Sequence, residues 1–96
     1  MTASVERAGS RLTVVGNMTM DTAADILSQG VSGLAVGVSE FDLSGVTEMD
    51  SSGLAVLFGW HRAAQAQGKP FRVYNPPRNL ISLAEVYGVS GLLPLV

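Results

Sequence analysis

The chain of 96 residues has no cysteine and little charge. Without cysteine it has neither disulfides nor thiolate metal ligands, so a packed apolar core must hold it together. Charged residues make up 15% of the chain, against about 25% in an ordinary soluble domain. So little charge indicates that part of the surface is normally covered by another molecule.

The chain also lacks a basic stripe, a signal segment and a long apolar run. Its net charge is −2 and its six Lys and Arg residues are scattered, which disfavours nucleic acid as a partner. No apolar stretch approaches the roughly 18 to 20 residues that span a bilayer, and no basic segment precedes a signal-type apolar stretch. We therefore expect a cytoplasmic protein that neither inserts into a membrane nor binds nucleic acid.

Hydrophobic periodicity and turn residues predict one α/β domain over residues 1–96. The predicted elements are strands at 5–8 and 12–15, a helix from 19 to between 29 and 36, a strand at 40–44, a helix from 50 or 51 to 67, a strand at 71–74 and a helix after 77 that ends at Gly88. Two strand-helix-strand crossovers require parallel neighbours, joined here to an N-terminal hairpin. We expect a mixed sheet of four to five strands with about three helices packed against it.

Some details of this fold follow from single residues. Thr19 is expected to cap the first helix, with Asp21 in its first turn, where a negative charge is favourable. Gly68 is expected to end the second helix. The apolar tail at 92–96 has three alternative positions: a last strand, a place under the third helix, or a place under a partner.

The residues needed for catalysis are scarce. His61 is the only histidine, and a triad with Ser51 and Asp42 is excluded because His61 lies ten residues into the helix that Ser51 begins, about 15 Å along its axis. Phosphate-binding and nucleophile-elbow motifs are missing. We predict a non-enzymatic protein in which His61 packs beside Leu54 and Phe58.

Asp42, Glu48 and Asp50 are the nearest approach to a carboxylate cluster. Such a cluster can bind a hard cation, but acidic residues at strand ends and helix starts more often act as caps. The sequence therefore predicts neither a metal site nor a cofactor.

The most informative segment is Asp50-Ser51-Ser52-Gly53, between a strand and a helix. One interpretation is that these are ordinary capping residues. The other is a switch: a phosphate on Ser51 meets like-charge repulsion from Asp50 and displaces a partner fitted to a hydroxyl. Spacing alone does not decide between them.

The helix after this segment lacks the polar face of a solvated helix, since Arg62 is its only charged residue between Ser51 and Gln67. A wheel of 100° per residue turns Leu54, Leu57, Phe58 and His61 toward the sheet, and Ala55, Gly59, Arg62 and Ala66 away from it. Small outward residues let another backbone approach closely, and Arg62 is a candidate anchor. Trp60, with Val56 and Ala63, either belongs to the core or serves as a partial anchor. The predicted partner-binding residues are Asp50, Ser51, Ser52, Gly53, Ala55, Gly59 and Arg62, with Ser51 as a possible phosphoacceptor.

Three segments, at 41–44, 49–54 and 68–73, resemble the STAS domain family in their residues and spacing. The resemblance covers nearly the whole chain. Two groups in that family are compact single domains, the MlaB proteins and the anti-sigma factor antagonists. The segment 83–89, followed by a short apolar tail with Leu93 and Pro94, is similar to the end of MlaB proteins.

Resemblance to MlaB implies a STAS subunit that binds an MlaF-like ATPase subunit of a phospholipid ABC transporter, beside a membrane permease. Such a subunit supports the assembly or activity of the complex, which maintains outer-membrane lipid asymmetry. It lies on the cytoplasmic side of the bacterial inner membrane through its partner, binding neither ATP nor lipid.

The alternative is an anti-sigma factor antagonist, in which the position matching Ser51 is phosphorylated by an anti-sigma serine kinase. MlaB proteins can carry Thr-Gly where this chain has Ser51-Ser52, and the Ser-Ser form is also found in antagonists. The motif alone does not separate the two groups.

Overall fold

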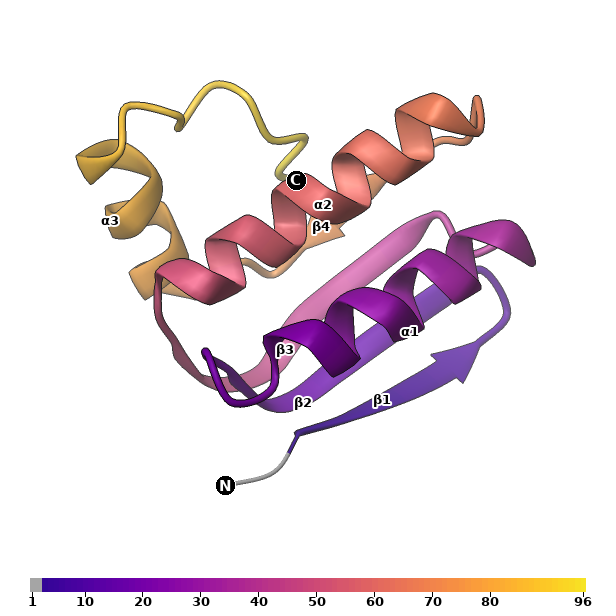
Figure 1. The fold of residues 1–96 in the computed structure, drawn as a ribbon, viewed down its shortest axis with the longest axis horizontal. Helices are drawn as coiled ribbons and strands as arrows, with labels where there is room; N and C mark the ends of the chain where they lie inside the picture. The colour runs from indigo at the N-terminus through magenta and orange to yellow at the C-terminus, as the bar shows by residue number, and fades with distance from the viewer. Residues whose placement is uncertain (1–2) are drawn as a thin grey trace.

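The sheet has four strands in the spatial order β1-β2-β3-β4 in the computed structural model, which describes residues 3–96 (Figure 1). The strands are β1 Ala3–Ala8, β2 Arg11–Met18, β3 Glu40–Met49 and β4 Arg72–Tyr74. β1 and β2 form an antiparallel hairpin, whereas β3 runs parallel to β2 and β4 parallel to β3. The predicted hairpin and mixed sheet are confirmed.

β2 and β3 are longer than their apolar alternation indicates. They were expected to end at Val15 and Ser44, but they end at Met18 and Met49. The pairing of the two strands contains two register shifts, which break the period of two on which the prediction rests. Gly45 permits one of these irregularities, since a Cβ there would lie 2.9 Å from the carbonyl oxygen of Val14.

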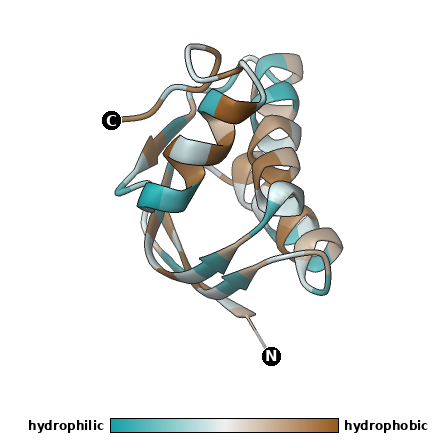
Figure 2. Cartoon of the chain, turned by 90° about the vertical axis from the view of Figure 1, so that its left-hand side faces the viewer, coloured by the Kyte–Doolittle hydropathy of each residue, from teal (hydrophilic) through white to brown (hydrophobic). Residues whose placement is uncertain are grey.

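The three helices are α1 Ala23–Ala35, α2 Ser51–Ala66 and α3 Arg78–Val86. α1 and α2 lie side by side over one face of the sheet (Figures 1 and 2). α3 lies beside the start of α2 and buries Leu80 and Ala84. None of the helices within residues 3–96 has the length and apolar character needed to cross a bilayer.

The predicted start of α1 at Thr19 is wrong. The Thr22 hydroxyl accepts a hydrogen bond from the Thr19 backbone N–H (3.1 Å) and donates one to the carbonyl oxygen of Asn17 (2.8 Å). This closes a turn before the helix, so α1 begins one turn later, at Ala23. Asp21 therefore precedes the helix, and Asp25 occupies its first turn.

Trp60 is fully buried and belongs to the core. Its ring packs against Phe41 at a centroid distance of 4.6 Å, and its Nε1 donates to the carbonyl oxygen of Leu27 in α1 (3.1 Å). A Cβ at Gly30 would lie 2.0 Å from that nitrogen. The close approach of α1 to α2 therefore requires a glycine at position 30.

Of the three positions expected for the C-terminal tail, it takes that of a last strand, reduced to a single bridge. Leu95 forms an isolated parallel bridge with Val73 of β4. The Val73 N–H donates to the carbonyl oxygen of Pro94 (3.1 Å), and the Val96 N–H donates to that of Val73 (2.9 Å). Leu93, in the same tail, is buried.

We predict that Gly30→Ala lowers the free energy of unfolding by about 1 to 3 kcal/mol, the usual cost of overpacking a core. The loss must exceed the roughly 1 kcal/mol that alanine gains in helix propensity. Urea denaturation measures it, with Ser28→Ala on the exposed side of α1 as the matched control. A Gly30→Ala protein more stable than the parent contradicts this packing.

Candidate functional site

Asp50 joins the start of α2 to the segment before α1. Its carboxylate accepts hydrogen bonds from the backbone N–H groups of Ser52 (2.8 Å) and Met20 (3.1 Å). Its own N–H donates to the carbonyl oxygen of Met18 (3.3 Å). Asp50 is the N-cap of α2, one of the two residues expected to cap it, and it also fixes Met20 beside the hydroxyl-bearing turn at Ser51 and Ser52.

The environment of Asp50 keeps it ionised. Burial raises the pKa of its carboxyl, but the N–H groups of Met20, Ser52 and Gly53 and the Ser52 side chain outweigh burial and hold the pKa below its usual range. A fixed negative charge therefore stands beside the exposed Ser51.

The two glycines predicted to contact a partner are covered, fully or in part, by the chain itself. Gly53 is buried, and a Cβ there would lie 2.6 Å from the carbonyl oxygen of Met18. Gly59 is half-buried, and a Cβ there would lie 2.7 Å from Leu27 Cδ1 of α1. The expected outward placement of Gly59 is therefore only partly right, and Gly53, predicted to bind a partner as part of the turn, is buried. The small residue at position 59 makes room for the Leu27 side chain of α1.

The buried side of α2 is turned toward α1 relative to the predicted stripe. Its buried residues are Gly53, Leu54, Val56, Leu57, Trp60 and Ala64. Phe58 and His61 are only half-buried, and the His61 ring stacks on Phe71 at 5.6 Å. The helical wheel assumed that α2 packs on the sheet alone, whereas α2 packs on both the sheet and α1. His61 therefore has a packing contact with Phe71 and is less buried than the predicted stripe requires.

Ser51, Ala55 and Arg62 are exposed on α2, and Ser52 is half-buried. Ala55 forms a ridge between two shallow grooves. The α1–α2 groove, about 390 Å³, has Leu27 and Ala55 in its walls, Ser52 at one end and Arg62 at the other. No carboxylate within residues 3–96 forms a salt bridge with Arg62.

The α2–α3 groove, about 350 Å³, lies on the other side of the ridge. Its lining consists of Ser51, Leu54, Ala55, Phe58, Tyr87 and Val89. Met20 and Tyr87 are 78% and 57% exposed. An apolar surface thus surrounds the hydroxyl-bearing turn.

Sequence reasoning missed Met20, Tyr87 and Val89 as members of this surface. Tyr87 follows Leu80 by seven residues, the spacing of one helical face, but it lies beyond the last residue of α3 and is exposed. The only signal for Met20 was its position, a large apolar residue in a turn between a strand and a helix.

The structure does not assemble the other candidate sites. The three residues of the possible triad have separate roles. Asp42 accepts a hydrogen bond from Arg11 on the face of the sheet turned away from α1 and α2, His61 stacks on Phe71, and Ser51 is the first residue of α2. No group of three metal-ligating side chains occurs in the part of the chain that the structure describes.

Residues 1–94 match the family model described as "Mlab, STAS domain". The intermembrane phospholipid transport system binding protein MlaB of Haemophilus influenzae is 36% identical over 53 residues. That match covers 55% of this chain and 50% of the relative, so it spans about half the length of that protein.

Solved structures share the fold. An anti-sigma factor antagonist from Mycobacterium paratuberculosis is 22% identical with a TM-score of 0.74, over 98% of this chain and 83% of that one. The unphosphorylated anti-sigma factor antagonist SpoIIAA is 15% identical with a TM-score of 0.69, over 99% and 87%. At such identities the likeness concerns the fold alone.

We predict that Asp50→Ala lowers the free energy of unfolding by about 1 kcal/mol at pH 7, the usual loss for an N-cap at an exposed helix end. Because the folded-state pKa of Asp50 is depressed, its contribution is present above about pH 4 and is lost as the pH falls further. Urea denaturation between pH 7 and pH 3 follows the loss. Asp21→Ala, at an exposed position before α1, controls for net charge; a difference independent of pH contradicts the prediction.

Proposed function

The chain belongs to the STAS family, in its MlaB group, and we propose that it is a non-enzymatic subunit that binds the ATPase subunit of a phospholipid-transport ABC complex. In that role it supports the assembly or activity of the complex. It lies on the cytoplasmic side of the inner membrane, held there by its partner, which acts with a membrane permease.

The observation that carries the proposal is the ridge of α2 between its two grooves. Ala55 is small and exposed, with the apolar Leu27 on one side and Tyr87 on the other. A partner that covers these residues removes apolar area from water without desolvating a charge, which favours association. Arg62, at the end of the ridge, offers a charged anchor at the rim.

Ser51 gives this surface a means of regulation. It lines the α2–α3 groove next to the ionised Asp50. Phosphorylation adds a charge of about −1.5 to −2 at neutral pH. A phosphate on Ser51 therefore adds unpaired negative charge to the apolar contact and opposes docking.

The alternative function is that of an anti-sigma factor antagonist that binds a serine kinase. It is supported by the exposed serine at the start of α2 and by the fold shared with SpoIIAA. In both functions the same surface of α2 binds the partner, so the identity of the partner separates them.

Purification of the tagged chain from its native cells, followed by mass spectrometry, tests the assignment. We expect an ABC ATPase and its permease to copurify with the chain. Recovery of a serine-kinase-like protein without an ABC ATPase overturns the proposal and favours the alternative. The same spectra report whether Ser51 carries a phosphate.

We predict that Ala55→Glu weakens binding of the copurified ATPase subunit by about 30- to 150-fold, since an unpaired carboxylate is costly to bury at an interface. The isolated domain should stay folded, because Ala55 is exposed. Titration calorimetry measures the affinity. Ala66→Glu, the same change three turns further along α2, is the matched control; equal affinities for both variants remove Ala55 from the interface.

Ser51→Asp should weaken binding by at least tenfold, because it places a second carboxylate beside Asp50. Ser51→Asn has a similar size and no charge, and it should bind within about threefold of the parent. Calorimetry with the same ATPase subunit compares the two. Equal losses for Ser51→Asp and Ser51→Asn show that shape matters at this position and that charge does not.

A further inference from the structure

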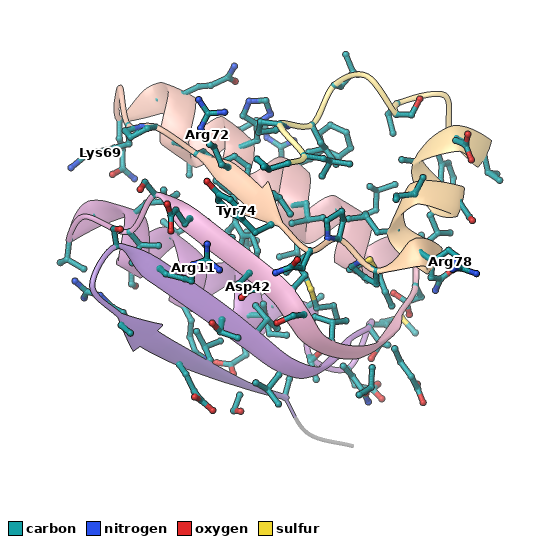
Figure 3. All side chains as sticks on the ribbon, turned by 180° about the vertical axis from the view of Figure 1, so that it is seen from behind. Arg11, Asp42, Lys69, Arg72, Tyr74 and Arg78 are labelled. Atoms are coloured by element: carbon teal, nitrogen blue, oxygen red, sulfur yellow. The ribbon has the colours of Figure 1, made fainter. Side chains whose placement is uncertain are left out.

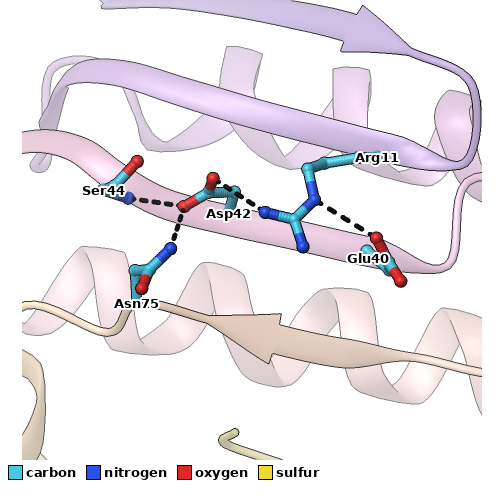
Figure 4. A network of polar contacts seen from close by, with 5 residues as sticks. All are labelled: Arg11, Glu40, Asp42, Ser44 and Asn75. Carbon is cyan, nitrogen blue, oxygen red and sulfur yellow. Dashed lines mark hydrogen bonds and ion pairs between the residues drawn. The ribbon is translucent and has the colours of Figure 1, made fainter.

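A carboxylate on the open face of the sheet, turned away from α1 and α2, joins three strands at one point (Figure 3). Asp42 is only 9% exposed. One of its oxygens accepts from Arg11 Nη1 (3.0 Å), and the other accepts from the Ser44 N–H (2.9 Å) and from Asn75 Nδ2 (3.0 Å) (Figure 4). β2, β3 and the residue after β4 are thus tied to one side chain.

Arg11 strengthens the same junction. Its Nε donates to Glu40 Oε1 (3.2 Å), and its guanidinium carbon lies 4.6 Å from the centre of the Tyr74 ring. Burial raises the pKa of Asp42, but its hydrogen bonds with Asn75, Ser44 and Arg11 outweigh burial and lower it. Asp42 therefore accepts these bonds as a carboxylate at neutral pH.

Asn75 has an unusual backbone conformation. Its φ is +53°, and no other non-glycine residue within 3–96 has a positive φ. Asparagine tolerates this left-handed region better than most residues. Pro76 and Pro77 follow directly, and because their rings fix φ, few free torsions separate Asn75 from the start of α3.

A second asparagine holds the start of α3. Asn79 Nδ2 donates to the carbonyl oxygen of Met49, at the end of β3. α3 has only nine residues and buries only Leu80 and Ala84. Its position therefore depends strongly on the hydrogen bonds of Asn75 and Asn79. Its far end leads to Tyr87 and Val89, which line the α2–α3 groove.

We propose that Asn75 is a positioning residue for the partner surface: its bond to Asp42 on one side of the sheet sets the α3 wall of the groove on the other side. The effect on partner binding rests on the proposed function. The position of α3 does not, and it is measured without a partner.

Asn75→Gly is the informative variant, because glycine accepts a positive φ without strain and only the side-chain bond is lost. Hydrogen exchange should accelerate about tenfold at the amides of 83–89 and change little in α1 and β2. Gly30→Ala is the control that loosens the domain as a whole. Acceleration spread evenly over the chain in Asn75→Gly overturns the proposal, since it indicates a general loss of stability.

A double-mutant cycle with Tyr87→Ala tests the link to the groove. Asn75→Gly should weaken binding of the ATPase subunit about three- to tenfold, and adding it to Tyr87→Ala should cost less than a further twofold. If the affinity losses of the two single variants multiply in the double variant, Asn75 does not act through Tyr87 and the link to the groove is overturned. If the unmodified chain does not bind the ATPase subunit, the proposed function fails, and hydrogen exchange alone decides whether Asn75 positions α3.

Discussion

The surface organisation of this domain depends on how closely α1 packs on α2. Gly30 and Gly59 bring the two helices together, and Trp60 fills the space between them and the sheet while its Nε1 bonds to the backbone of α1. With an indole fixed in this way, α2 has one permitted rotation about its axis. That rotation turns Ser51, Ala55 and Arg62 outward. The packing of the core and the composition of the partner surface are therefore set by the same contact.

Those parts of the fold that depend on local chemistry were predicted from the sequence. These parts are the N-terminal hairpin, the cap of α2 at residue 50 or 51 and the helix end at Gly68. Each rests on residues within one turn of each other, and the structure has all three. The start of α1 was wrong because the Thr22 hydroxyl competes for the backbone of Thr19. The predicted length of β3 was wrong because register shifts interrupt its alternation of buried and exposed residues.

The candidate site was predictable only in part. Asp50, Ser51, Ala55 and Arg62 occupy one helix or its cap, so their relation follows from helical geometry. Met20 lies 30 residues before Asp50 and Tyr87 lies 25 residues after Arg62, and only the folded chain brings them to the same surface. Likewise, a helical wheel gives the direction of Gly59, but it does not tell whether α1 or a partner fills the space beside it.

The two outer strands of the sheet have different edges. Along β1, the exposed Glu6 and Arg7 place charges on the free edge, and Arg7 is bonded to the carbonyl oxygen of Val36 (3.1 Å). Along β4, the tail occupies the N–H and carbonyl groups of Val73. An edge protected in this way resists the strand-to-strand growth that leads to aggregates. A protein with so little charge can thus display an apolar helical surface to its partner while one edge of its sheet is covered by its own tail and the other carries charged side chains.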